Sequence, residues 1–129
     1  MKIIITGVSG YLAKIVALQL SNQGHDVIGI DHRPWSDCPS SIRLERLDIR
    51  KRPAADLFRH VKPKAVIHMA TETYVSATKE ERYRLNLKGT QAIWSFCERF
   101  GVKQALFAGV TRSMALLQTL HYFARKLNH

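Results

Sequence analysis

Short apolar runs alternate with stretches of helical periodicity along this chain, and this alternation predicts βαβ units around a parallel sheet. Buried strands are expected at residues 3–5, 26–31, 42–47, 64–70 and 102–107. Helices are expected at residues 11–22, 54–61 and 79–100, where apolar positions recur every three or four residues. The fold class that follows is α/β, a doubly wound parallel sheet.

The apolar positions of the predicted helices indicate which side chains enter the core. In the first helix these positions are Leu12, Ile15, Val16, Leu18 and Leu20, and Gly24 follows as a C-terminal cap. In the long helix, Ile93, Trp94 and Phe96 are expected in the core. The tail is also amphipathic, with one face made of Met114, Leu117, Leu120 and either Phe123 or Ala124.

A glycine turn joins the first strand directly to the first helix. Gly7 and Gly10 supply backbone conformations that other residues adopt at a cost, and Gly10 leaves room for a pyrophosphate to approach. The helix N-terminus adds unpaired N–H groups and a partial positive charge. Strand, turn and helix in this order form a phosphate cradle, which predicts dinucleotide binding.

Asp31 ends the second strand, about 20 residues beyond the glycines, where a carboxylate accepts hydrogen bonds from the adenosine ribose hydroxyls. The same charge repels a 2′-phosphate and therefore favours NAD over NADP. Arg33 compensates for this repulsion if its side chain swings across the pocket. The alternative interpretation of Asp31 is a solvated acid at a strand end.

Length and composition are those of one ordinary globular domain: 129 residues, of which 46% are hydrophobic. No apolar run approaches the ~20 residues of a membrane span, and neither a signal peptide nor a membrane partner is expected. Cys38 and Cys97 match neither a disulfide framework nor a metal site. A reduced, cytoplasmic setting is therefore expected.

The formal net charge of +10 permits nucleic-acid binding, but its distribution favours a solvated basic face. The main basic cluster comprises Arg43, Arg46, Arg50, Lys51, Arg52, Arg59, Lys62 and Lys64. No aromatic residues interleave with it in the manner of a nucleic-acid motif, so nucleic acid is the less favoured partner.

A set of short motifs follows in order along residues 1–107: TGVSGYLA at 6–13, Asp31, LDI at 47–49, VIHMAT at 66–71, NLKGT at 86–90 and GVK at 101–103. This set resembles the extended short-chain dehydrogenases, the NAD-dependent epimerase/dehydratase family. The resemblance implies a Rossmann domain over residues 1–129, in which the tail at 111–129 has no assigned role. Ala13 stands in the third glycine slot, a substitution that dinucleotide fingerprints tolerate.

The resemblance also implies the residues that would hold NAD. They are Gly7, Ser9, Gly10, Tyr11, Leu12, Asp31, His32, Arg33, Asp48, Ile49, Met69, Ala70, Thr71 and Asn86. Within this set, Asp48 takes the adenine amine, and Met69 to Thr71 lie beside the nicotinamide ribose. His68 is expected to be a core or strand-end histidine rather than a catalytic one.

The family continues from its fifth strand into a Ser/Thr segment, a Tyr-x-x-x-Lys helix, further strands and a substrate lobe. The resemblance therefore implies a Rossmann sheet that is incomplete after the fifth strand in this chain. Tyr122 and Lys126 have that spacing, and the ammonium would lower the pKa of the phenol so that Tyr122 acts as a general base. The alternative, a Tyr and a Lys that merely share an amphipathic helix, is favoured. Ser113 precedes Tyr122 by only nine positions, without the loop that brings the family's catalytic groups together. The same objection applies to Thr111 and Ser113 as hydrogen-bond partners of the substrate hydroxyls.

Three functions remain open at this point, and whether the chain is an enzyme is left undecided. The leading hypothesis is the cofactor domain of an oxidoreductase or isomerase that acts on a nucleotide sugar, in a truncated form. The alternatives are a dinucleotide-binding regulator or redox sensor without catalysis, and a nucleic-acid-binding module on a Rossmann scaffold. A homodimer through the helix at residues 79–100 is a further possibility.

Overall fold

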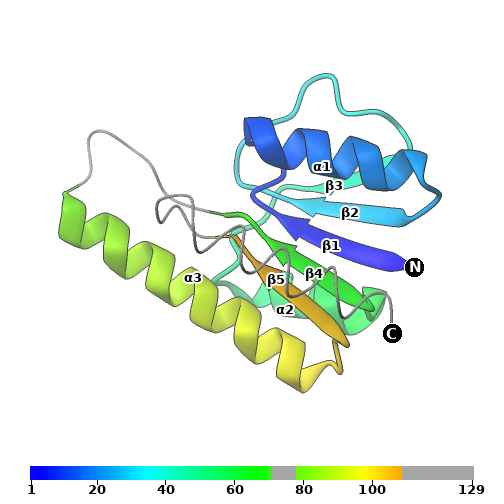
Figure 1. Ribbon diagram of the computed structural model, residues 1–129. Helices are drawn as coiled ribbons and strands as arrows, with labels where there is room; N and C mark the ends of the chain where they lie inside the picture. Colours follow the sequence, from blue (N-terminus) through cyan, green and yellow to red (C-terminus); the bar gives the residue numbers. More distant parts are fainter. Residues whose placement is uncertain (71–77, 109–129) are drawn as a thin grey trace.

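The computed structural model describes residues 1–70 and 78–108, which form a parallel sheet flanked by helices (Figure 1). The strands are β1 (Lys2–Thr6), β2 (Asp26–Ile30), β3 (Ile42–Glu45), β4 (Ala65–His68) and β5 (Gln104–Phe107). They lie in the order β3-β2-β1-β4-β5, and every neighbouring pair is parallel. The sheet therefore winds outward in both directions from β1, as a doubly wound fold requires.

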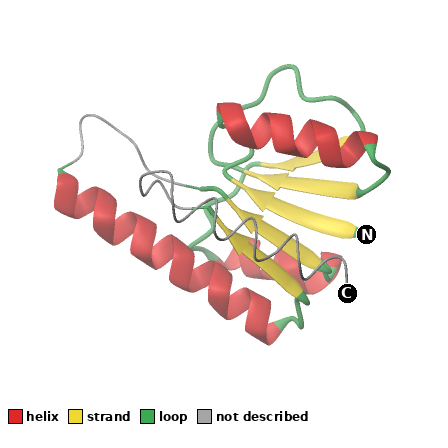
Figure 2. Cartoon of the chain, in the orientation of Figure 1, coloured by secondary structure: helices red, strands yellow, loops and turns green. Residues whose placement is uncertain are grey.

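Helices cover both faces of this sheet (Figure 2). The helix α1 (Tyr11–Asn22) lies on one face, and α2 (Arg52–Val61) and α3 (Lys79–Arg99) lie on the other. Alternate residues of β1 enter the two cores: Ile3 and Ile5 pack on the side of α1, and Ile4 packs on the side of α2 and α3. Burial on both faces explains why the central strands β1, β2 and β4 are mostly apolar.

The five strands and three helices expected from the sequence are all present, with small shifts at their ends. The second helix begins at Arg52 rather than at residue 54, because Pro53 is well tolerated in a first turn. It ends at Val61, where Lys62 adopts a left-handed φ of 51° before Pro63. The long helix begins with a reciprocal cap, in which the Thr78 and Glu81 side chains each accept a hydrogen bond from the other residue's backbone N–H.

The apolar face predicted for the first helix is partly wrong. Leu12, Ile15 and Leu18 are exposed, at 53%, 45% and 39% of their surface. The residues that face the sheet include Ala13 and Ala17, which are buried, with Val16 and Leu20 packed beside them. The small alanine side chains let the helix lie close against the sheet, so the larger leucines are left on its outer side.

Trp94 is a second departure from the sequence interpretation. Ile93 and Phe96 are buried as expected, but Trp94 keeps 56% of its surface exposed. Its indole N–H donates to Glu98 Oε1 at 2.7 Å, and its ring contacts Phe107 on β5 at a centroid distance of 5.6 Å. Trp94 therefore covers the outermost strand of the described sheet rather than filling the core.

Within residues 1–70 and 78–108, no helix has the length and apolar character needed to cross a bilayer.

The turn after β1 is tightly constrained at Gly7. Its φ is +70°, and a Cβ there would lie 2.6 Å from the backbone nitrogen of Ala70. Gly24, after α1, also has a positive φ, of +89°, but a Cβ there would meet nothing within 4 Å. Among the glycines of residues 1–70 and 78–108, Gly7 alone combines a positive φ with a close approach to another part of the backbone, the segment that follows β4.

We expect Gly7→Ala to lower the free energy of unfolding by about 3 kcal/mol, because conformational strain and overlap with Ala70 add together. The matched control is Gly24→Ala, which carries the conformational cost alone, about 1 kcal/mol. Urea denaturation of both variants measures the difference. Equal losses in the two variants would contradict a close approach at Gly7.

Candidate functional site

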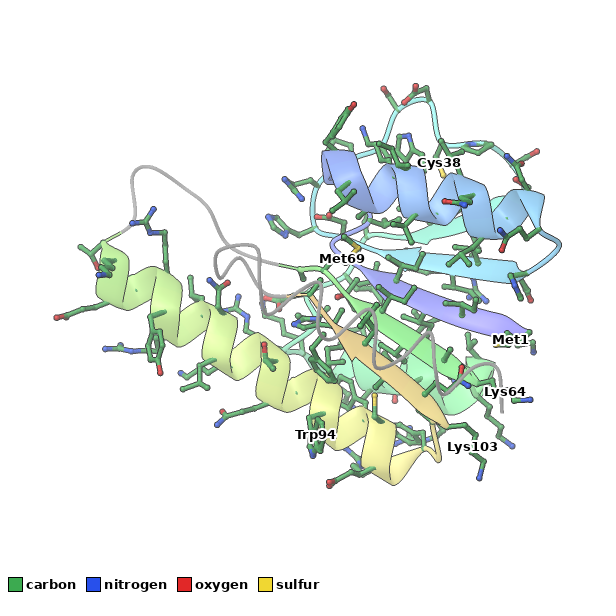
Figure 3. The ribbon with its side chains drawn as sticks, in the orientation of Figure 1. Met1, Cys38, Lys64, Met69, Trp94 and Lys103 are labelled. Atoms are coloured by element: carbon green, nitrogen blue, oxygen red, sulfur yellow. The ribbon has the colours of Figure 1, made fainter. Side chains whose placement is uncertain are left out.

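A cleft opens at the carboxyl edge of the sheet, where β1 and β4 end. Figure 3 shows Met69 at this edge and Met1, Lys64 and Lys103 at the opposite one. The cleft has a volume of about 390 Å³. It is lined by eight residues that the sequence interpretation singled out: Gly7, Asp31, His32, Arg33, Asp48, Ile49, Ala70 and Asn86. Parallel sheets bind ligands at this edge, beside the strand where the winding reverses.

The first turn of α1 faces this region without an internal cap. Gly10 is the N-cap residue, with φ −70° and ψ 154°; no side chain caps the helix, and its first turn contains no acidic residue. A Cβ on Gly10 would meet the Gly7 carbonyl oxygen at 3.3 Å and Arg33 Nη2 at 3.7 Å. The backbone conformation is thus open to any residue, and the missing side chain leaves space before a helix terminus that attracts anions.

Asp31 is buried and accepts four hydrogen bonds. Oδ2 accepts from the Ser9 backbone N–H at 3.0 Å and from Arg33 Nη2 at 3.2 Å. Oδ1 accepts from the Arg33 backbone N–H at 2.9 Å and from Arg33 Nε at 3.2 Å. Burial raises the pKa of Asp31, but the hydrogen bonds from Arg33 and Ser9 outweigh it and hold the pKa below its ordinary value. A solvated strand-end acid is therefore ruled out, since only 4% of Asp31 is exposed.

Asp48 forms a similar unit with Arg50 after β3. Its carboxylate accepts from the Arg50 backbone N–H at 2.9 Å, from Nε at 3.0 Å and from Nη2 at 2.7 Å. These bonds lower the pKa of Asp48 to about 2. Arg50 lines the cleft and was missed by the sequence interpretation. The repeated Asp-x-Arg spacing, at residues 31–33 and 48–50, is the signal that would have found it.

Two further cleft residues, Leu85 and Gly89, lie on α3. Leu85 was missed from the sequence, and Gly89 belongs to the motif at 86–90 but was not predicted to hold the cofactor. A Cβ on Gly89 would meet Ile49 Cδ1 at 3.0 Å, so this glycine allows the helix to pack closely beside residue 49. A glycine in the interior of a helix destabilises the helix by about 1 kcal/mol relative to alanine. A glycine within the predicted long helix was therefore the signal in the sequence for a close contact at this position.

A buried polar network connects β1, β4 and α3 behind the cleft. Thr6 Oγ1 accepts from the backbone N–H groups of Met69 and Ala70, at 3.2 and 3.3 Å. Its own proton is therefore donated to His68 Nδ1, at 2.6 Å, and the proton of the imidazole lies on Nε2, which is 3.3 Å from Thr90 Oγ1. Burial lowers the pKa of His68 to about 4. His68 is thus neutral, and it is a buried histidine at the end of β4, which agrees with the core or strand-end position expected from the sequence.

The remaining predicted residues lie outside the lining of the cleft. Ser9 supports it indirectly, by its N–H bond to Asp31 and by donating Oγ–H to the Arg33 carbonyl at 3.0 Å. Tyr11 and Leu12 are exposed on the first turn of α1, and Met69 packs into the core on the side of α1. The other predicted residues, Thr71, Tyr122 and Lys126, lie outside the described residues, as do Thr111 and Ser113.

Metal-binding clusters of three or more His, Cys, Asp or Glu side chains do not occur in the described part of the chain. Cys38 and Cys97 are free thiols, and burial raises the pKa of both. The cleft is lined by two carboxylates and their arginine partners, and the uncapped N-terminus of α1 lies beside it, next to Arg33. This combination can accept hydrogen bonds from hydroxyl groups and can hold an anion.

The profile of the NAD dependent epimerase/dehydratase family matches residues 3–115. UDP-glucose 4-epimerase of Bacillus subtilis (strain 168) is 28% identical over 122 residues, which cover 84% of this chain and 36% of the relative. The chain thus spans little more than a third of the length of this curated relative.

Solved structures share the fold. The UDP-glucose 4-epimerase of Thermus thermophilus, in a complex with NAD, superposes with a TM-score of 0.74 at 19% identity. That match covers 96% of this chain and 50% of the other. MoeE5, in a complex with UDP-glucose and NAD, superposes with a TM-score of 0.71 at 27% identity, over 84% of this chain and 36% of the other.

The buried histidine makes stability depend on pH. The pKa of His68 is about 4 in the folded protein, against an ordinary value of 6.5, so the unfolded chain takes up a proton first as the pH falls. The contribution of neutral His68 to the free energy of unfolding is fully present above pH 6.5 and is lost as the pH falls toward 4. The expected loss between pH 6.5 and 4.5 is about 2 kcal/mol. Denaturant unfolding over this range measures it.

The control is His68→Gln, whose side chain can form hydrogen bonds and has no charge at any of these pH values. It should lack this part of the pH dependence. An equal slope in both proteins would mean that His68 protonates within the fold.

Proposed function

This chain belongs to the NAD-dependent epimerase/dehydratase family, and we propose that it binds NAD in the cleft at the carboxyl edge of its sheet. The observation that carries the proposal is the space before α1. Gly10 has a backbone conformation open to any residue, yet its missing side chain leaves the uncapped N–H groups of the first turn accessible. A pyrophosphate supplies the negative charge and the acceptors that these groups lack.

The other cleft residues have roles that fit the two ends of the cofactor. Asp31 would accept the hydroxyls of the adenosine ribose, and Asp48 with Ile49 would contact the adenine edge. Ala70, just after β4, and Asn86, on α3, also line the cleft and would contact the nicotinamide half. The buried negative charge of Asp31 would oppose a 2′-phosphate, so we propose NAD in preference to NADP.

We further propose that the chain serves an oxidoreductase or isomerase that acts on a nucleotide sugar. When bound, NAD supplies a nicotinamide ring that accepts and returns a hydride. The residues of this chain would anchor and orient the cofactor and exclude water from its adenosine half. The proposal is supported by the relatives, which are named as UDP-glucose 4-epimerases, and by MoeE5, whose structure contains UDP-glucose with NAD.

Two broader proposals concern the setting of the molecule. The exposed apolar side chains of Tyr83, Leu87 and Trp94, at 71%, 43% and 56% of their surface, support a homodimer in which α3 meets its counterpart. Their spacing of four and seven residues brings them to one side of the helix. The free thiols of Cys38 and Cys97 suit a reducing, cytoplasmic environment.

Calorimetric titration with NAD should give saturable binding to the unmodified chain, and Gly10→Ala should weaken it at least tenfold, because the new methyl group occupies the pyrophosphate position. The free energy of unfolding should change by less than about 1 kcal/mol. Gly24→Ala is the matched control, since it costs a similar amount of stability far from the cleft and should bind NAD normally. A folded sample of the unmodified chain that binds neither NAD nor NADP would refute the proposed function.

Replacing the Asp31 carboxylate by an amide should weaken NAD binding roughly tenfold, because a charged acceptor of the ribose hydroxyls is lost. Asp31→Asn should also reduce the difference in affinity between NAD and NADP. Titration with both cofactors measures these effects, and Asp56→Asn is the control, since Asp56 pairs with Arg59 on α2 at 2.8 Å outside the cleft. An unchanged preference would mean that Asp31 does not touch the ribose.

A further inference from the structure

We propose that Arg33 is an internal competitor of the cofactor: its guanidinium and the adenosine ribose hydroxyls contend for the same oxygens of Asp31. Arg33 would then set both the affinity for NAD and the choice between NAD and NADP. This inference rests on the proposed function and adds a specificity-determining residue to it.

Hydrogen-bond donors of the protein fill the acceptor positions of Asp31. An ionised carboxylate offers about four acceptor positions, and Asp31 accepts four hydrogen bonds in this structure. Two come from the backbone N–H groups of Ser9 and Arg33, which the glycine turn and the end of β2 hold in place. The other two come from the Arg33 guanidinium. A ribose diol needs two acceptor positions, so it can bind Asp31 only after the guanidinium has left.

The guanidinium is able to leave Asp31. The Arg33 side chain is 44% exposed, whereas the side chain of Asp31 is 2% exposed. Both guanidinium contacts are 3.2 Å long, at the outer limit for such hydrogen bonds, and the exposed guanidinium returns to water when it leaves. The ribose hydroxyls would then supply the hydrogen bonds that Asp31 loses.

The position of the guanidinium supports the same competition. Arg33 Nη2 lies 3.7 Å from the place where a Cβ of Gly10 would stand. The guanidinium thus lies at the glycine turn, close to the N-terminus of α1. It occupies part of the space proposed for the cofactor.

The second Asp-x-Arg unit provides an internal comparison. Asp48 accepts hydrogen bonds from the same three donors of Arg50, but no described residue adds a fourth donor in the way that Ser9 does for Asp31. Asp48 therefore keeps one acceptor position for a ligand donor such as an adenine amine while its arginine stays bound. Competition is expected at Asp31 and not at Asp48.

Displacement of Arg33 has different consequences for the two cofactors. With NAD, the ion pair is lost and no negative group replaces Asp31 as its partner at the ribose. With NADP, the 2′-phosphate offers a dianion to which a guanidinium binds in a bidentate manner. Arg33 should therefore penalise NAD and assist NADP, so that the preference for NAD is smaller than Asp31 alone would produce.

The test compares Arg33→Ala and Arg33→Lys with the unmodified chain by calorimetric titration with NAD and with NADP. Arg33→Ala should bind NAD about fivefold more tightly, since the competing pair is gone, and NADP about tenfold more weakly. Arg33→Lys lacks the bidentate fork but keeps the charge, so it should gain NAD affinity and keep part of its NADP affinity. Arg43→Ala removes a comparable ion pair, with Glu45 on β3, and should behave as the unmodified chain does.

Binding of NAD to Arg33→Ala that is equal to or weaker than binding to the unmodified chain would overturn the competition. If neither protein binds NAD, the proposed function fails and the competition fails with it. A second measurement follows the Arg33 Nε–H signal by NMR in the unmodified chain. Saturating NAD should shift this signal, and a signal that stays unchanged on saturation would also overturn the proposal.

Discussion

The close approach of Gly7 to Ala70 is the constraint on which the rest of the site depends. The chain leaves β1 between two strands, and the Gly7 N–H donates to the Ile30 carbonyl on one side at 2.8 Å. On the other side, a Cβ at Gly7 would overlap the backbone of Ala70. Passage through this gap decides where α1 begins and brings the Ser9 N–H onto Asp31. The same turn therefore orders the fold and arranges the donors around the carboxylate.

The Thr6, His68 and Thr90 network supports this turn from behind. The Thr6 hydroxyl oxygen accepts hydrogen bonds from two backbone N–H groups just after β4. Its own proton is therefore donated to His68. A positively charged imidazole would have no acceptor at Nδ1, because the oxygen next to it is already satisfied. Burial and hydrogen bonding thus favour the same neutral state. The network joins β1, β4 and α3 without placing a charge in the core.

Much of the fold and of the cleft followed from local patterns. A strand, a glycine turn and a helix predicted the arrangement around Gly7 and Gly10, and the acid after the second strand was correctly predicted to lie beside them. Helix surfaces were less predictable. Periodicity indicates that a helix has an apolar side, but Leu12 and Trp94 show that a large apolar residue can lie outside the core. Which side packs depends on how closely the backbone approaches the sheet, and small residues control that distance.

By itself, the sequence determined the class of the fold, the order of its elements and the types of group present at the carboxyl edge of the sheet. These features depend on the periodicity of apolar residues, on the residues that form turns and on the spacing between motifs, all of which can be read from the sequence. Only the tertiary structure decided that Asp31 accepts four hydrogen bonds, that Asp48 accepts three from Arg50, and that Arg33 lies at the glycine turn. The partners of these carboxylates and the space around the glycine turn depend on residues far apart in the chain. They are defined only when the strands have paired and brought those residues together.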